Sequence, residues 1–251
     1  PIVKGFMVGR TLWVEASQNI PDLMLKALAP AIPDKVRAST FGSDLAEFTY
    51  GTDPRTNRYY IIAEESVPGG WGARPDSDGE SALHALAEGD TYNIPIEMME
   101  VNYPLFISKY ELLPDSGGPG KWRGGVGAVK SIAPIGHDAK MVATFERSKY
   151  SPAWGLFGGK PGAPNRVEIH RRDGTIEPHM KVTDMPLLNG DVAWYYGGGG
   201  GGYGDPFERD PQMVLDDVLN GYVSPEKAKS EYGVAIDLAN KEVDETATKK
   251  I

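Results

Sequence analysis

The chain has 251 residues, of which 40% are hydrophobic and 24% charged, so it has the composition of a globular protein with a sizeable core. Its net charge of −9 argues against a nucleic-acid or anionic-membrane partner, and the lack of cysteine excludes disulfides, thiolate nucleophiles and cysteine-bound zinc. No apolar stretch approaches the roughly 20 residues of a membrane span and no signal peptide opens the chain, so we expect a cytoplasmic protein.

The first segment, residues 1–100, combines helix, strand and loop patterns. The stretch IPDLMLKALAPAIP predicts a short helix, with Asp22 near its start and Pro30 as a stop signal. Residues 57–67 are aromatic and β-branched and predict a strand. A long glycine-rich and acidic loop follows at residues 66–90, and the tryptophan embedded in it, Trp71, favours a functional loop over a disordered one.

The second segment, residues 101–200, predicts β-structure throughout. Short alternating stretches separated by turn signals are typical of an antiparallel sandwich or barrel. The predicted strands are YPLFISKYELL, GGVGAVKSIAPI, AKMVATFERS, NRVEIHRRDG and GDVAWYYG.

The third segment, residues 201–251, predicts two helices and a polar surface tail. Asp210 and Ser224 are N-cap residues, each followed by a proline, and Gly221 and Gly233 are stop signals. The fold class is therefore α+β: a mainly antiparallel β body, sandwich- or barrel-like, with a short N-terminal helix and two C-terminal helices. We expect the three segments to form one compact domain of a larger subunit.

Six consecutive glycines, Gly197–Gly202, separate the β body from the C-terminal helices. They match the pattern Gly-x-Gly-x-x-Gly, but a dinucleotide site requires a helix directly after the glycines within a βαβ unit. Here Tyr203 to Pro206 intervene and the surrounding pattern is antiparallel. We interpret the run as an architectural crossing anchored by Tyr203 and Asp205, with ligand contact as a secondary role.

The segment PDSGGPG resembles the nucleophile loop of serine proteases around Ser116. In those enzymes the residue two before the serine donates a backbone N–H to the oxyanion, and here that residue is Pro114, which has no N–H. The sequence therefore favours a tight turn between two strands.

Metal-ligand and acid–base patterns are weak. None of the four histidines has the spacing that places two ligands on one helix face, although His170 and His179 could converge across a hairpin. Exposed polar residues are the favoured interpretation. Glu97 and Glu100 would share one face of a helical turn, as an acid–base pair or, preferably, as salt-bridge partners. The four histidines are His84, His137, His170 and His179.

Four blocks in order carry a family resemblance. They are GGWGARPDSDGESA, NIPIEMMEVNYPLFISKYELLPDSGGPGKWRGGVGAVK, PAWGLFGGKPGAPN and GGGGGGYGDPFERDPQMVLDDVLNGYVSPEKAKSEYGV. In this order they resemble the C-terminal half of the hydantoinase B / 5-oxoprolinase family, related to the large subunits of acetone and acetophenone carboxylases, over about residues 20–235.

The resemblance implies a subunit or fragment of an ATP-dependent enzyme complex. Such proteins act with a hydantoinase A-like partner that binds ATP, and the pair opens a cyclic amide or carboxylates a ketone. The family's metal-associated His and Asp segments lie in an N-terminal half that this sequence does not match. We therefore expect ATP and a divalent metal to bind outside this chain, and a second chain to supply the missing half, in line with the start at Pro1 without a methionine.

The candidate site is the glycine-rich loop. Glycines let the backbone approach a ligand closely, so Gly69, Gly70, Trp71 and Gly72 are predicted to bind substrate. Arg74, Asp78 and Arg123 are the predicted catalytic residues, with the arginines pairing an anionic substrate or phosphate.

Two alternatives stay open at this point. The arginines are equally compatible with structural ion pairs. The chain is also compatible with a non-catalytic scaffold subunit. In either case, a piece of a larger subunit should expose apolar surface.

Overall fold

A computed structural model describes residues 17–43, 46–64, 67–84, 86 and 93–248. Its helices and 3₁₀ turns are α1 (Ser17–Leu28), η2 (Pro33–Lys35), α2 (Ile96–Asn102), η3 (Pro206–Glu208), α3 (Pro211–Leu219), α4 (Pro225–Tyr232) and α5 (Glu245–Thr248). Its strands are β1 (Ala46–Asp53), β2 (Arg58–Glu64), β3 (Leu105–Leu112), β4 (Ala128–Pro134), β5 (Ala139–Thr144), β6 (Arg166–His170), β7 (Ile176–His179), β8 (Lys181–Leu187), β9 (Val192–Tyr196), β10 (Ile236–Asp237) and β11 (Glu242–Val243).

Two antiparallel sheets form the body. One has the strand order β2-β1-β5-β8 and the other has the order β3-β4-β9-β6-β7. Their inward-facing side chains share one core, in which Met141 of the first sheet and Ile132, Ile169 and Tyr195 of the second are fully buried. The predicted α+β class with a mainly antiparallel, sandwich-like body is confirmed. The division into three segments stays a prediction.

Alternation between buried and exposed residues explains why most of these strands could be recognised in the sequence. In β6 and β9 every second residue is buried, as expected for strands with one face on the core. The sequence-based assignment missed β1, β7 and β8. Gly51 lies within β1 and weakens its strand pattern in the sequence. Pro186 has the same effect in β8. This strand also contains the left-handed residue Asp184 and shifts its register against β5.

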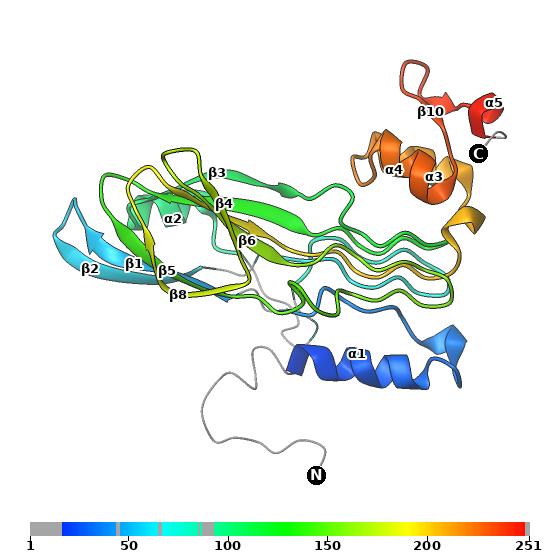
Figure 1. The fold of residues 1–251 in the computed structure, drawn as a ribbon, viewed down its shortest axis with the longest axis horizontal. Helices are drawn as coiled ribbons and strands as arrows, with labels where there is room; N and C mark the ends of the chain where they lie inside the picture. The colour runs from blue at the N-terminus through cyan, green and yellow to red at the C-terminus, as the bar shows by residue number, and fades with distance from the viewer. Residues whose placement is uncertain (1–16, 44–45, 65–66, 85, 87–92, 249–251) are drawn as a thin grey trace, which may run out of the picture.

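A bundle of extended segments continues the sandwich towards the C-terminal helices (Figure 1). Gly197–Gly202 runs through it and exchanges backbone hydrogen bonds with five other parts of the chain, near residues 39, 70–73, 118, 125–128 and 156–163. For example, the Gly200 N–H donates to the Gly125 carbonyl at 2.9 Å, and the Gly118 N–H donates to the Gly200 carbonyl at 2.8 Å. A sheet strand has only two neighbours, so this segment is surrounded in three dimensions. We call the arrangement the glycine bundle.

Close packing of backbones explains why the run contains only glycine. A Cβ atom on Gly199 would lie 1.8 Å from the Ser116 carbonyl oxygen, and one on Gly200 would lie 1.9 Å from the Trp71 oxygen. Every other glycine of the run has a backbone carbonyl oxygen within 2.5 Å of the same position. The prediction of a crossing between the β body and the helices is thus refined: the run is a central member of the glycine bundle.

The C-terminal helices follow the predicted signals. The Asp210 carboxylate accepts the Gln212 N–H at 2.8 Å, and the Ser224 hydroxyl accepts the Lys227 N–H at 3.2 Å. Gly233 ends α4 in the left-handed conformation, with φ of 70°. The helices share a small apolar core of their own, and the polar tail after them forms the β10–β11 pair and α5.

The predicted anchors of the glycine run are also present. The Tyr203 hydroxyl donates to the Pro33 carbonyl at 2.8 Å, and the Asp205 carboxylate accepts the Phe207 N–H at 2.9 Å. Both contacts fix the point at which the glycine bundle passes into the helical end of the molecule. Among the helices of the described ranges, none has the length and apolarity of a membrane-spanning segment.

Candidate functional site

The predicted substrate-binding glycines are part of the glycine bundle. A Cβ on Gly70 would lie 1.8 Å from the Gly125 oxygen, and one on Gly72 would lie 1.9 Å from the Ala38 oxygen. At Gly69 the obstacle is the Phe41 ring, 2.0 Å away. The close approach that these glycines permit is therefore to other parts of the chain. Their predicted contact with substrate stays a prediction.

Trp71 projects from this segment and carries a cationic neighbour. Its indole Nε1–H donates to the His84 carbonyl at 2.8 Å, which fixes the ring. The Arg37 guanidinium lies over the ring face, 4.6 Å from its centroid, in a cation–π contact. Within the part of the chain that the structure describes, this guanidinium has no hydrogen bond or ion pair.

Arg74 and Glu80 belong to the same loop as Trp71, whose backbone N–H donates to the Glu80 carbonyl at 2.9 Å, and their charges act on Arg37. Partial burial lowers the pKa of Arg37, the nearby charge of Arg74 lowers it further, and Asp22 and Glu80 act in the opposite direction. Arg74 donates to Glu80 Oε1 at 2.8 Å across half-exposed side chains, whereas Glu80 Oε2 is buried without a hydrogen-bond partner. We call Arg37, Trp71, Arg74 and Glu80 the arginine patch. The Arg37 guanidinium forms no hydrogen bond with the carboxylates that act on it, Asp22 and Glu80, so its N–H donors remain available to an anion.

Asp78 and Arg123 meet each other in a different environment. Asp78 Oδ1 accepts the Arg123 backbone N–H at 2.7 Å, and both Asp78 oxygens accept from Arg209 at 2.7 Å. Asp217 on α3 pairs with Arg209 at 2.7 Å and with Arg123 at 3.1 Å. We call these four residues the ion cluster. The side chains of its two arginines and of Asp217 are at least nine-tenths buried.

The ion cluster is internally matched in charge. Burial on its own lowers the pKa of Arg209, but the hydrogen bond with Asp78 and the charges of Asp217 and Asp78 raise it overall. Two cations and two carboxylates satisfy one another and hold α3 against the loop that contains Asp78. This geometry corresponds to the structural ion pairs that the sequence left open. The catalytic role of Asp78 and Arg123 stays a prediction.

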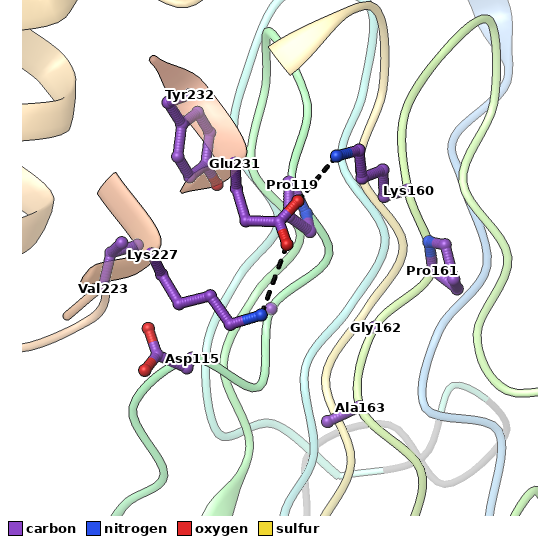
Figure 2. Close-up of a pocket in the computed structure, with 11 residues that line it drawn as sticks. Asp115, Pro119, Lys160, Pro161, Gly162, Ala163, Val223, Lys227, Glu231 and Tyr232 are labelled. Carbon is purple, nitrogen blue, oxygen red and sulfur yellow. Dashed lines mark hydrogen bonds and ion pairs between the residues drawn. The ribbon is translucent and has the colours of Figure 1, made fainter. Parts of the chain in front are cut away.

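A cavity of about 340 Å³ lies between the glycine bundle and α4 (Figure 2). Glu231 on α4 accepts from Lys160 at 2.6 Å and from Lys227 at 3.3 Å, as Figure 2 shows. The hydrogen bond from Lys160 keeps the pKa of Glu231 below its ordinary value. Because one carboxylate already engages both lysines, the charged groups of this cavity satisfy each other in large part. Asp115, also in its wall, accepts the N–H of Ser224, the N-cap residue of α4, at 2.7 Å.

Tyr232 is the buried polar group of the same cavity wall. Its side chain is 4% exposed, and its hydroxyl has no hydrogen-bond partner. Burial raises the pKa of this hydroxyl, which therefore stays protonated. The arrangement offers a proton donor beside ion-paired lysines, but no unpaired charge.

Ser116 has a structural role. Its hydroxyl donates to the Leu113 carbonyl at 2.6 Å and accepts the Gly127 N–H at 2.9 Å, while its backbone carbonyl accepts the Ala163 N–H at 2.7 Å. The residue before it, Asp115, has a left-handed φ of 62°. These contacts describe a turn that ties the β body to the glycine bundle, in agreement with the rejection of a protease loop.

The histidines and the glutamate pair also have structural surroundings. His170 lies 3.3 Å from Glu168 and His179 lies 3.4 Å from Glu177, and the β6–β7 register places neither histidine opposite the other. Glu97 and Glu100 do lie on a helix, α2, where Glu100 accepts the Ile107 N–H at 2.9 Å. In the described ranges, no three His, Asp or Glu side chains come together in a way that could hold a metal ion.

Several residues of these sites were not identified from the sequence. Arg37 stands in the stretch DKVRAST, which matches no motif, and its proximity to Trp71 arises only from the pairing of residues 38–41 with 70–73. Arg209 and Asp217 lie in the ERDPQMVLDD helix signal, where acidic and basic residues are common at the surface. The charged residues around the cavity, Lys160, Lys227 and Glu231, come from segments far apart in the chain.

The fold and the site define a β-sandwich protein in which a glycine bundle positions a cationic loop. The sequence model of the Hydantoinase B/oxoprolinase family matches residues 9–206. The chain belongs to this family, and the resemblance noted in the sequence is confirmed.

Individual relatives are parts of larger enzymes. The B-type component of a putative D-/L-hydantoinase from Pseudomonas sp. (strain NS671) is 32% identical over 86% of this chain and 36% of its own. The crystal structure of the ATP-dependent caprolactamase from Pseudomonas jessenii matches with a TM-score of 0.79 at 34% identity, over 90% of this chain and 40% of its own. The nucleotide-free structure of acetone carboxylase matches with a TM-score of 0.75 at 25% identity, over 89% and 34%. The chain thus spans about two fifths or less of the relatives that it matches.

Proposed function

We propose that this chain is part of an ATP-dependent complex that opens a cyclic amide, of the hydantoinase and 5-oxoprolinase type. The observation that carries the proposal is the match to the caprolactamase structure over nine tenths of this chain. Caprolactam and hydantoin are both cyclic amides, so two independent relatives point to one substrate class. In this proposal a hydantoinase A-like partner binds ATP, and further polypeptide supplies what the chain lacks relative to its relatives.

Ketone carboxylation is the second candidate. The structural match to acetone carboxylase favours it, because the same fold serves that ATP-dependent reaction. A non-catalytic, structural subunit of either kind of complex is the third candidate, and it is supported by the extensive internal pairing of the ion cluster.

We propose that ATP and a divalent metal bind outside the described part of this chain. The sequence has no Gly-x-x-x-x-Gly-Lys-Ser/Thr motif for a nucleotide phosphate. A metal lacks a donor set in the same way, because no three His, Asp or Glu side chains of the described residues come together in a way that could hold one. The expected cytoplasmic location stays a prediction.

The arginine patch is our candidate for contact with an anionic group. Phosphorylated amides and ring-opened amino acids both carry anions, and arginine binds carboxylate or phosphate through a planar fork of N–H donors. Arg74 and the unpaired Arg37 would bind the anion, and Trp71 would hold Arg37 in place. Asp78 and Arg123 would act indirectly, by fixing the loop that carries Arg74.

Reconstitution with the hydantoinase A-like partner and with the polypeptide that supplies the unmatched part of the subunit tests this function. We expect ATP-dependent opening of hydantoin, 5-oxoproline or caprolactam, and we expect no ATP-dependent consumption of acetone and bicarbonate. ATP-dependent consumption of acetone and bicarbonate without ring opening would support the carboxylase alternative. Equal turnover by a complex without this chain would support the non-catalytic, structural role.

The site assignment has its own test in the same complex. Because a charge-assisted hydrogen bond contributes about 1.5–3 kcal/mol, Arg37→Met should lower kcat/KM by roughly 10- to 150-fold. Arg58→Met, at an exposed arginine of β2, is the control and should have little effect. Normal turnover by an Arg37→Met, Arg74→Met double variant would refute the role of the arginine patch in anion binding. It would not refute the proposed reaction.

A further inference from the structure

Helix α1 presents four large apolar side chains to solvent, whereas its buried residue is an aspartate. Asp22 is the one buried residue of Asn19–Leu28, at 2% exposure. Ile20, Leu23, Met24 and Leu28 are between 39% and 60% exposed. These four follow one another at helical spacing and form one face, which we call the α1 face. A helix that packs only on its own domain shows the opposite arrangement.

Buried polar contacts fix this orientation. Asp22 Oδ2 accepts the Ser39 hydroxyl at 2.8 Å, the Thr40 N–H at 2.8 Å and the Thr40 hydroxyl at 2.9 Å. The Arg147 guanidinium lies 3.3 Å from the same oxygen and donates through Nε to Asn19 Oδ1 at 2.6 Å. Rolling α1 to bury its apolar side would break these contacts and expose a buried ion pair, so the helix is locked with the α1 face outward.

The α1 face lies apart from the other helices. Figure 1 shows α1 along one side of the glycine bundle, whereas α3, α4 and α5 gather at its end. Lys26 of α1 is exposed, but its ammonium group lies over the Trp154 ring, 4.4 Å from the centroid, and so lies at the edge of this face. The remaining outer surface is apolar and suits another protein surface, since exposed patches of this kind mark interaction sites.

We propose that the α1 face docks polypeptide equivalent to the part of the hydantoinase B-type subunits that has no counterpart in this chain. The larger part of each relative lies outside the match, while nearly all of this chain lies within it. That additional polypeptide belongs to the same subunit in the relatives, and a locked apolar helix is a surface for it to cover. The proposal rests on the assembly proposed above, and it applies whether the covering segment is on the same chain or on a separate one.

Site-specific photo-crosslinking tests the occupant. The photoreactive residue p-benzoyl-phenylalanine replaces Met24 in the protein as expressed in its own cells, and crosslinked peptides are identified by mass spectrometry. The control places it at Ile176 of β7, which is 56% exposed against 60% for Met24. We expect Met24 adducts with family sequence that aligns outside the region matched by this chain, and no such adducts from Ile176.

Other occupants would overturn the proposal. Adducts with a second copy of α1 would show a homodimer face, and adducts with residues 1–16 would show that the chain covers its own helix. A Met24 yield no higher than the Ile176 yield would show an uncovered surface. Crosslinking requires no turnover. The docking proposal can therefore be refuted while ATP-dependent ring opening is observed, and docking can be confirmed while ring opening is absent.

A binding measurement on substituted proteins tests the same docking without crosslinking chemistry. Truncating two apolar side chains of the α1 face with Leu23→Ala and Met24→Ala should weaken association with the crosslinked polypeptide by at least about tenfold. Ile176→Ala should leave association unchanged. Equal melting curves for the three proteins would show that the fold is preserved, and unaltered association of the double variant would refute docking on the α1 face.

Discussion

The glycine bundle makes a quantitative prediction at Gly199. In Gly199→Ala the new Cβ would lie 1.8 Å from the Ser116 carbonyl oxygen and 2.3 Å from its carbon, so one of the two backbones must move. The movement strains two hydrogen bonds, from Gly199 to Ala163 at 3.1 Å and from Ala163 to Ser116 at 2.7 Å. Overpacking costs about 1–3 kcal/mol and two weakened hydrogen bonds add about 1–3 kcal/mol. Reduced freedom of the unfolded chain returns about 0.4–1 kcal/mol.

Gly199→Ala should therefore lower the free energy of unfolding by about 1–5 kcal/mol. With a urea dependence of about 3 kcal/mol per molar, the unfolding midpoint should fall by roughly 1 M. The matched control is Gly51→Ala in β1, where the nearest atoms to a Cβ are 3.4 Å away and φ is not left-handed. Its midpoint should stay the same or rise slightly. Equal midpoints for the two variants would refute the argument that backbone packing requires glycine in this run.

Three further predictions concern the ion pairs. Asp217→Ala leaves two buried arginines without their shared carboxylate and should destabilise the protein by about 3–5 kcal/mol, an effect that urea titrations at low and high salt should show equally. Asp22→Ala should release α1, seen as faster hydrogen exchange in residues 19–29 with little change in the β-sandwich. Lys160 keeps the pKa of Glu231 below 4.5, so the pair stabilises the fold above this pH and the effect is lost as pH falls through the lowered pKa. Lys160→Met should therefore flatten the acid limb of the stability profile below about pH 5, by less than about 1 kcal/mol because Lys160 is half-exposed.

Local sequence patterns predicted most of the fold. Caps such as Asp210 and Ser224 act within a few residues, and alternation in β6 and β9 reports a single buried face, so both could be recognised without knowledge of the fold. Strand β8 could not, because Asp184 and Pro186 are accommodated by a register shift against β5. That accommodation depends on a partner strand about 40 residues earlier in the chain.

The site was less predictable for a similar reason. Arg74 and Trp71 were found because an aromatic and a cation in a glycine-rich loop are unusual on their own. Arg37 was not, since nothing near it in sequence distinguishes it from a surface arginine. The ion cluster illustrates the converse. Asp78 and Arg123 attracted attention as functional residues, and only the fold shows that Asp78 is paired with Arg209 and Arg123 with Asp217.

The glycine bundle determines how the arginine patch can work. Residues 70–73 are hydrogen-bonded to the glycine run, by Gly70 to Gly198 at 2.9 Å and by Ala73 to Gly201 at 2.9 Å. A few residues later Asp78 is held by the ion cluster. The loop that carries Trp71 and Arg74 is thus fixed at both ends and is unsuited to act as a closing lid. An anion at the patch would meet preorganised donors, which favours binding because no loop has to be ordered.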